Sequence, residues 1–358
     1  MSVSTQGAKD PKLYKDSCIV LSDGHKMPVI ALGTLAPSML CKDMFTRKAQ
    51  SDSGEILAQT PSPEHFNTVL DATKYALDIG YRHVDCAFPY RTEGAVGQAL
   101  LEKILEGTVK RKDFFYTTKL WCTFHRPYLV RPAVENVLAS AHLDYIDLLI
   151  IHHPVSLKPV GDLFPVHENG EALYDHVDLR ETWEAMEQCK DAGLVKSIGL
   201  SNFNRRQLEM ILNKPKLKYK PVCNQVECHP YLSQKNLLEF CNANDIVLVG
   251  YGLLGSRGAG SLVDENCPAV LDDPVLISLA KKYKKTPAQI SIRYTLQQGC
   301  AVVVKSFNPD HMMQNLQVFD FNLSAEDMKT IDGLNKNIRY WNCAWWKSHP
   351  EYPFENGD

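Results

Sequence analysis

Residues 147–152 read DLLIIH, four consecutive apolar residues between an aspartate and a histidine. A short, uninterrupted apolar run indicates a strand that is covered on both faces, as the strands of parallel sheets are. Seven further short runs of this kind occur along the chain. The eight predicted strands are residues 29–33, 82–86, 114–119, 147–152, 196–201, 222–227, 246–251 and 301–305.

Helical patterns lie between these strands. The apolar face that starts at Phe66 stops at Gly80, a residue type that often ends helices in the left-handed conformation. Thr286 and Gln289 form a capping box with Pro287 at the first helical position. Eight strands, each followed by a helical segment, predict an α/β fold of the closed (β/α)8 type, the TIM barrel. The alternative is a doubly wound nucleotide-binding sheet, which is disfavoured because no G-x-G-x-x-G motif follows an early strand.

Three segments stand outside the alternation. Residues 18–21 and 27–30 flank the turn sequence SDGHK, which predicts an N-terminal β-hairpin. Residues 36–62 are too long for an ordinary strand-to-helix loop and are interpreted as an insertion after the first strand. The segment from Tyr340 onward is rich in aromatic residues and is expected to form a loop that closes one end of the barrel. The whole of residues 1–358 is expected to be one barrel domain.

Composition excludes several classes of function. The chain is 44% hydrophobic and 23% charged with a net charge of −3, so neither a nucleic-acid partner nor a membrane partner is expected. The N-terminus has no apolar signal segment, and no run of 18 apolar residues occurs. The eleven cysteines include no C-x-x-C pair, which favours reduced thiols in a cytoplasmic protein and no metal site.

Four titratable residues fall at the C-terminal ends of neighbouring strands, where barrel enzymes place their active sites. Asp85 and Tyr90 follow the second strand, Lys119 ends the third and His152 ends the fourth. A carbonyl that accepts a hydride gains negative charge on oxygen and needs a proton, which Tyr90 would donate. Lys119 would lower the pKa of Tyr90, Asp85 would keep Lys119 charged, and His152 would orient the carbonyl oxygen. Each residue alone has an ordinary structural explanation, but their joint placement favours an oxidoreductase site.

A second candidate site lies where the last strand meets its helix. Lys305, Ser306 and Phe307 are followed by Asn308 as a plausible N-cap and Pro309 as the first helical residue. A helix N-terminus with a nearby ammonium and hydroxyl forms an anion site, and phosphates bind at this place in many barrels. The alternative is an ordinary capped helix with an exposed lysine.

Several motifs resemble the aldo-keto reductase family. They are GYRHVD (residues 80–85) with Tyr90, TKLW (118–121), HLDYIDL (142–148) with His152, GLSNF (199–203), NQVE (224–227) with His229 and Pro230, and Lys305 with Ser306. The similarity extends from residue 20 to about residue 354. Residues 204–215 most resemble the hydroxysteroid dehydrogenase branch, which includes dihydrodiol dehydrogenases and rho-crystallin. The resemblance implies that Asp85, Tyr90, Lys119 and His152 are the catalytic residues, with Tyr90 as the proton donor.

The resemblance also implies NADP(H) as the cofactor. Tyr251 would stack on the nicotinamide, Ser256 would lie along the pyrophosphate, and Lys305 would hold the 2′-phosphate. The implied cofactor residues are Gly33, Thr34, Leu35, Asp85, Ser201, Asn202, Gln225, Tyr251, Leu254, Ser256, Lys305, Ser306, Phe307, Asn308, His311, Gln314 and Asn315. The expected substrate-binding residues are Tyr90, His152, Trp121, His153 and Trp341.

The sequence departs from the family pattern near the predicted site. His311 stands where the family usually has an arginine, and histidine is a weaker phosphate partner. Leu35 replaces a usual tyrosine, Pro89 precedes Tyr90, and His153 occupies a position that often lines the substrate pocket. These departures and the insertion at 36–62 bear on cofactor preference and substrate identity more than on the type of reaction.

The predicted function is NADP(H)-dependent reduction of ketones or aldehydes, or oxidation of the alcohols, on apolar substrates such as steroids, prostanoids or aromatic carbonyls. Reduction of a steroid carbon–carbon double bond is disfavoured, because the branch with that activity has a glutamate at the position of His152. The non-enzymatic alternative is a crystallin-like structural or cofactor-binding protein with low turnover. The resemblance suggests a monomer.

Overall fold

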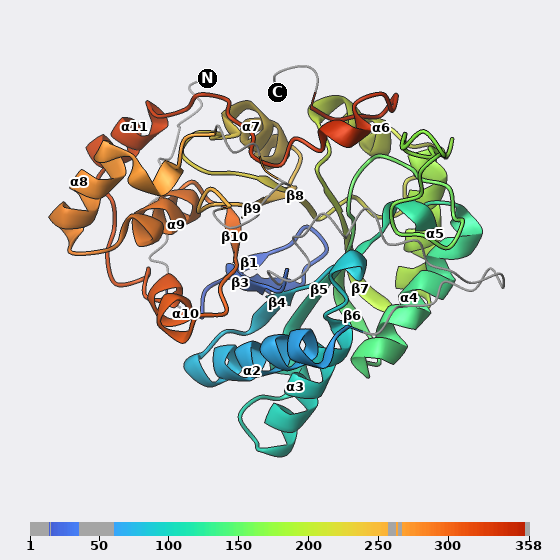
Figure 1. Ribbon diagram of the computed structural model, residues 1–358, viewed down its shortest axis with the longest axis horizontal. Coiled ribbons are helices and arrows are strands. Elements are labelled where there is room, and N and C mark those ends of the chain that lie inside the picture. The colour runs from blue at the N-terminus through green and yellow to red at the C-terminus, as the bar shows by residue number, and fades with distance from the viewer. Residues whose placement is uncertain (1–13, 15, 36–60, 257–262, 264–266, 355–358) are drawn as a thin grey trace, which may run out of the picture.

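The computed structural model describes residues 14, 16–35, 61–256, 263 and 267–354. Eight parallel strands close into a barrel in the order β10-β3-β4-β5-β6-β7-β8-β9, with helices around it (Figure 1). All eight predicted strands are present, so the predicted TIM barrel is confirmed. Their bounds are β3 (Ile30–Gly33), β4 (His83–Asp85), β5 (Phe115–Leu120), β6 (Ile146–Ile151), β7 (Val195–Ser201), β8 (Cys223–Glu227), β9 (Val247–Tyr251) and β10 (Ala301–Val304).

The apolar run in β6 is buried on both faces, as its sequence predicts. Leu148 and Ile150 pack in the cluster that fills the barrel interior, together with side chains from the other strands. Leu149 and Ile151 belong to the larger cluster between the strands and the surrounding helices. This alternation follows from the two-residue period of a strand.

The helices begin and end where their local signals predict. Gly80 ends α2 with a φ of 114°, a left-handed conformation that favours glycine. Thr286 and Gln289 form the predicted capping box at the start of α9, and Pro287 is its first residue. The helices are α2 (Pro63–Ile79), α3 (Glu93–Leu105), α4 (Pro127–Ala141), α5 (Leu179–Asp191), α6 (Arg205–Leu212), α7 (Lys235–Ala243), α8 (Pro274–Tyr283), α9 (Pro287–Gln297), α10 (Pro309–Leu316) and α11 (Ala325–Asp332). Short 3-10 turns include η2 (Phe88–Tyr90) and η7 (Ala344–Trp346).

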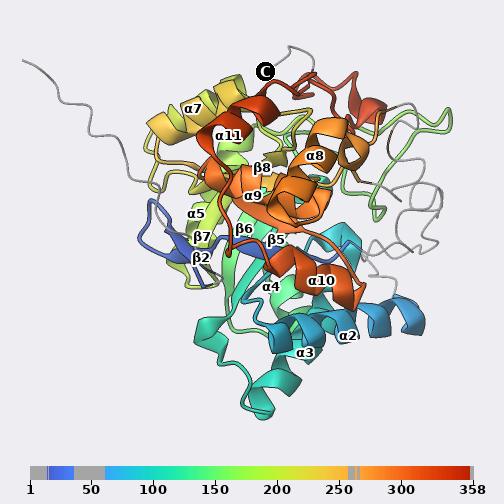
Figure 2. The same ribbon diagram turned by 90° about the vertical axis from the view of Figure 1, so that its left-hand side faces the viewer.

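The predicted N-terminal hairpin closes the floor of the barrel. It consists of β1 (Cys18–Val20) paired antiparallel with β2 (Lys26–Pro28). Leu21 and Met27 are buried in the same cluster as the inward-facing strand residues. Asp23 in its turn accepts hydrogen bonds from Lys190 at 2.7 Å and from Ser197 at 2.9 Å. Figure 2 shows the hairpin at the left of the barrel, so access to the interior is limited to the opposite end.

Two further segments were predicted, the insertion at residues 36–62 and the aromatic segment from Tyr340 onward, and the structure describes mainly the second. Residues 36–60 of the predicted insertion lie outside the described residues. The aromatic C-terminal segment is present and packs over the barrel, with Tyr340 and Trp346 buried. Among the described helices, none combines the length and the apolar composition that a membrane crossing requires.

Candidate active site

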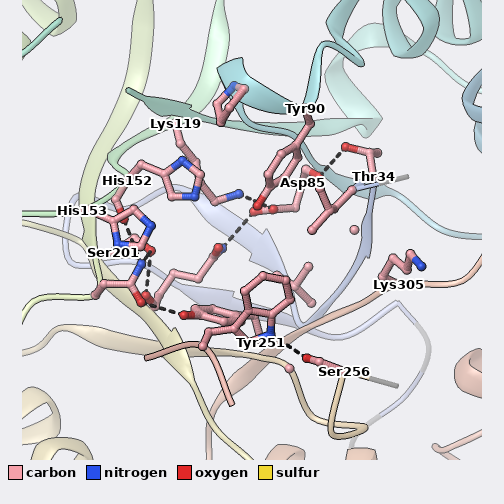
Figure 3. Close-up of a pocket in the computed structure, with 18 of the residues that line it drawn as sticks. Thr34, Asp85, Tyr90, Lys119, His152, His153, Ser201, Tyr251, Ser256 and Lys305 are labelled. Carbon is pink, nitrogen blue, oxygen red and sulfur yellow. Dashed lines mark hydrogen bonds and ion pairs between the residues drawn. The ribbon is translucent and has the colours of Figure 1, made fainter. Parts of the chain in front are cut away.

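Four predicted catalytic side chains meet at the open end of the barrel (Figure 3). Asp85 ends β4, Lys119 lies one residue before the end of β5, and His152 directly follows β6. Strands β4, β5 and β6 are neighbours in parallel register, so their carboxyl ends lie side by side. Tyr90 comes from η2, the 3-10 turn that follows β4. The structure therefore brings all four together.

Asp85 and Lys119 form a buried ion pair in this group. The Lys119 Nζ contacts Asp85 Oδ1 and donates a second hydrogen bond to the backbone carbonyl of Cys86 at 2.8 Å. Gln225 Nε2 donates to Asp85 Oδ2 at 2.8 Å, so both carboxylate oxygens have partners. The Lys119 and Asp85 side chains are only 2% and 4% exposed. Charges this deeply buried persist only when they are paired and hydrogen-bonded, and here they are.

Tyr90 points its hydroxyl toward this pair (Figure 3). Lys119 Nζ lies 5.4 Å from the centroid of the Tyr90 ring. Burial raises the pKa of Tyr90 well above its ordinary value, and the negative charge of Asp85 raises it further. The net shift combines several effects, so the lowering effect expected from Lys119 stays a prediction. Tyr90 is protonated at neutral pH, which is the form that a proton donor needs.

His152 is a neutral imidazole in an aromatic setting. Burial lowers its pKa well below the ordinary histidine value, and the neighbouring His153 and Lys119 lower it further. Its ring stacks on His153 and meets the edges of Trp121 and Tyr90. A neutral imidazole carries one N–H, so His152 can donate a hydrogen bond to a substrate oxygen without bringing a charge.

These side chains open into a cavity of about 460 Å³. Trp121 and His153, two predicted substrate residues, line it, and so does Trp341 from the C-terminal segment. Ten other lining residues were not predicted as site residues: Pro89, Phe164, Gly252, Leu253, Leu271, Val303, Val304, Cys343, Trp345 and Trp346. The only available signal was the aromatic composition of the C-terminal segment. Trp121 lies 5.1 Å from Phe164 and 5.8 Å from Trp346 between ring centroids, so the substrate end of the cavity is mainly aromatic.

Another part of the cavity wall, next to His152, holds the residues expected near a nicotinamide. Tyr251 donates from its hydroxyl to Asn202 Oδ1 at 2.8 Å, and Asn202 Nδ2 donates to the carbonyl of His152 at 2.9 Å. Ser201 donates to the carbonyl of Gln225 at 2.8 Å. These bonds hold polar side chains in place along one wall. Twelve predicted cofactor residues line the cavity, namely Gly33, Thr34, Leu35, Asp85, Ser201, Asn202, Gln225, Tyr251, Leu254, Ser256, Lys305 and His311.

Five predicted cofactor residues do not line the cavity: Ser306, Phe307, Asn308, Gln314 and Asn315. Asn308 is the N-cap of α10, and its side chain accepts from the amides of Asp310 at 2.9 Å and His311 at 3.2 Å. Lys305 has no carboxylate partner among the described residues, and it shares the cavity rim with His311. The Lys305 ammonium at the cavity wall fits a phosphate group. Among the described side chains there is no cluster of His, Cys, Asp and Glu that could hold a metal ion.

Comparison with known proteins agrees with this site. Residues 56–336 match the Aldo/keto reductase family. The chain is 54% identical to human aldo-keto reductase family 1 member C3 over 342 residues, which is 96% of this chain and 98% of the relative. It is 53% identical to mouse family 1 member C18 over 336 residues, 94% of this chain and 97% of the relative. It is 52% identical to rabbit prostaglandin-E(2) 9-reductase over 347 residues, 97% and 99% of the two chains. The chain therefore belongs to the aldo/keto reductase family of oxidoreductases.

Proposed function

We propose that this protein reduces ketone or aldehyde groups on apolar substrates with NADPH, and oxidises the matching alcohols in the reverse direction. The observation that carries this proposal is the convergence of Tyr90, His152 and the Lys119–Asp85 pair at the base of an aromatic cavity. The match to a family of carbonyl-reducing enzymes supports it.

Each of the four residues has a different role at the carbonyl oxygen. His152 donates a hydrogen bond that fixes the direction of the oxygen, and the Tyr90 hydroxyl lies beside the same point. The bound dinucleotide supplies a hydride, with both of its electrons, to the carbonyl carbon. Tyr90 transfers its proton to the oxygen as negative charge develops there, and regains a proton from solvent. The Lys119 ammonium, held in place by Asp85, would stabilise the negative charge that the Tyr90 oxygen carries after the proton transfer.

NADP(H) fits the residues that line the cavity. Ser201, Asn202, Gln225 and Tyr251 present amide and hydroxyl groups on one wall. Lys305 adds a cation without a carboxylate partner among the described residues, where the 2′-phosphate would lie. His311 stands beside it in place of the usual arginine, so the preference for NADPH over NADH is expected to be smaller than an arginine would give.

The substrate class follows from the aromatic walls. Trp121, Phe164 and Trp346 bury a large apolar area around a few polar groups, which favours a flat, apolar carbonyl compound. A prostaglandin reductase among the relatives is consistent with this size and polarity. Steroids, prostanoids and aromatic carbonyls are the classes to test.

The deciding experiment measures NADPH consumption by the purified protein with a panel of these three classes and with small aliphatic aldehydes. Turnover with the bulky apolar carbonyls supports the proposal. Tight NADPH binding without turnover on any of them would contradict it and favour a crystallin-like protein that binds the cofactor.

A further inference from the structure

Trp341 links the substrate wall to a residue on the expected path of the cofactor. Its indole Nε1 donates to Ser256 Oγ at 2.6 Å, the bond drawn at Ser256 in Figure 3. Both residues line the cavity. A serine hydroxyl has one proton and two lone pairs, so accepting from Trp341 leaves its proton free to donate. No acceptor for that proton is present among the described residues.

The backbone of Trp341 is fixed by a carboxylate from β8. Glu227 accepts from the amide of Tyr340 at 2.7 Å and from the amide of Trp341 at 3.0 Å. His229 Nε2 lies 2.9 Å from the same carboxylate, and neither side chain is exposed. A buried carboxylate with three partners fixes the segment more firmly than an exposed one would, because each lost bond leaves a buried group unsatisfied. Trp341 therefore enters the cavity at a set position.

Gly252 closes the gap between these residues. Its φ is +69°, and a Cβ there would lie 3.3 Å from Glu227 Cγ, 3.7 Å from Ser256 Oγ and 3.9 Å from Trp341 Cδ1. The anchoring carboxylate, the serine hydroxyl and the indole thus surround one backbone position after β9. Because Glu227, Ser256 and Trp341 pack around this one position, a shift of any of these three side chains disturbs the other two.

We propose that Trp341 is a positioning residue for the pyrophosphate of the dinucleotide, acting through the hydroxyl of Ser256. The indole N–H occupies the serine oxygen, so the serine proton is directed into the cavity, where an anionic oxygen is its acceptor. A chain of donor, hydroxyl and anion strengthens each bond in it. Because the same indole lines the substrate cavity, one side chain serves both ligands. This inference rests on the proposed function, since it requires a bound dinucleotide.

The test is a double-mutant cycle on dinucleotide affinity. Calorimetric Kd values for NADPH and NADH are measured with the wild type, Trp341→Phe, Ser256→Ala and the double variant. Phenylalanine keeps an aromatic ring but lacks the N–H. Trp341→Phe is expected to weaken both dinucleotides about two- to tenfold, the range of one neutral hydrogen bond. Ser256→Ala is expected to weaken both as well, and adding Trp341→Phe to it is expected to cost nothing more.

Trp183→Phe is the matched control, because it also removes an indole hydrogen bond, from Trp183 Nε1 to the carbonyl of Tyr219 at 3.0 Å, but Trp183 does not line the cavity. It is expected to leave both Kd values unchanged. The inference would be overturned if Trp341→Phe weakened dinucleotide binding equally in the wild type and in Ser256→Ala. Unchanged or tighter dinucleotide binding in Trp341→Phe would overturn it as well. A loss confined to NADPH would also overturn it, because the pyrophosphate is common to both dinucleotides. If Trp341→Phe does not fold, unchanged affinity in Ser256→Ala alone overturns the inference. Failure of the wild type to bind either dinucleotide would instead refute the proposed function.

Discussion

The imidazole rings of His152 and His153 stack with their centroids 4.8 Å apart and their planes 18° apart. Metal-free catalytic histidines are often oriented by a hydrogen bond at the second ring nitrogen. Here His152 Nδ1 is buried without a hydrogen-bond partner among the described residues. Ring contacts replace that bond, since the edges of Trp121 and Tyr90 lie 5.2 Å and 5.9 Å away between centroids. His153 therefore orients His152 by packing.

Replacing His153 tests this packing. His153→Ser removes the stacked ring and is expected to lower kcat by about fivefold, because an aromatic pair contributes about 1 kcal/mol. His153→Phe keeps a ring in the same place and is expected to retain most of kcat. Steady-state kinetics with one carbonyl substrate provide the comparison. Equal kcat values for the serine variant and the wild type would show that the stack does not orient His152.

Tyr90→Phe is expected to abolish most carbonyl reduction. The hydroxyl that donates the proton is lost, and general acid catalysis contributes roughly 10²- to 10⁴-fold. The NADPH Kd is expected to stay close to the wild-type value, since the Tyr90 hydroxyl has no hydrogen bond to another cavity side chain within the part of the chain that the structure describes. Single-turnover rates and calorimetry give the two numbers. A variant with near wild-type turnover would require another proton donor.

Asp85→Asn is expected to destabilise the protein by about 3–5 kcal/mol. The substitution leaves the Lys119 ammonium buried without its counter-charge, and a broken buried pair typically costs this much. The double variant Asp85→Asn, Lys119→Met removes both charges and is expected to recover much of the loss. Urea unfolding measures both. A double variant less stable than Asp85→Asn would show that Lys119 contributes through contacts other than the pair.

Glu93, at the start of α3, is expected to make the stability of the protein depend on pH. Burial raises its pKa from 4.5 to about 8, against the opposing effects of nearby amides and the Lys119 charge. Below pH 4.5 the carboxyl is protonated in the folded and unfolded chains alike. Between pH 4.5 and 8 the unfolded chain loses this proton and the folded protein keeps it, so the free energy of unfolding falls as the pH rises.

Glu93→Gln removes this dependence while keeping the shape of the side chain. The free energy of unfolding of the Glu93→Gln variant, minus that of the wild type, is expected to increase as the pH rises from 4.5 to 8. The increase is up to about 1.4 kcal/mol for each pH unit. Chemical unfolding at pH 5, 6.5 and 8 measures the difference. A constant difference at all three values would show that Glu93 is ionised in the folded protein.

His311→Arg is expected to widen the preference for NADPH over NADH by about tenfold or more. An arginine offers a permanent, charge-assisted bond to the 2′-phosphate, of about 1.5–3 kcal/mol. His311→Gln, which is uncharged, is the matched control and is not expected to widen it. The ratio of the two Kd values is the measurement. An unchanged ratio in His311→Arg would place the 2′-phosphate away from α10.

Local sequence signals predicted most of the fold. Continuous apolar runs and capping residues act over a few positions, so the Thr286 box and the end of α2 at Gly80 were predictable. The ends of the strands were predicted less accurately. Strand β4 spans only His83–Asp85, whereas the sequence predicted a strand of five residues there. The end of a parallel strand depends on pairing with neighbours, which no local pattern records.

The catalytic group was predictable because the barrel itself dictates where strand ends meet. The rest of the cavity wall was only partly predictable, because Phe164 and Trp346 lie outside the barrel strands and long helices, in segments whose positions depend on distant contacts. One such contact is the 2.7 Å hydrogen bond from Trp121 Nε1 to the carbonyl of Leu163. The direction of the Tyr90 pKa shift also required the structure, since it depends on burial and on the nearby charge of Asp85.

The carboxylate of Glu227 binds a segment of the chain that the ribosome synthesises much later than Glu227 itself. It accepts from amides 113 and 114 residues later, whereas all four predicted catalytic residues precede residue 153. A domain generally folds as a unit, so the barrel closes only after β10 has been synthesised. The predicted proton donor, Tyr90, leaves the ribosome well before Tyr340 and Trp341. The C-terminal segment that carries Trp341, Trp345 and Trp346 is the last part of the cavity wall to be synthesised.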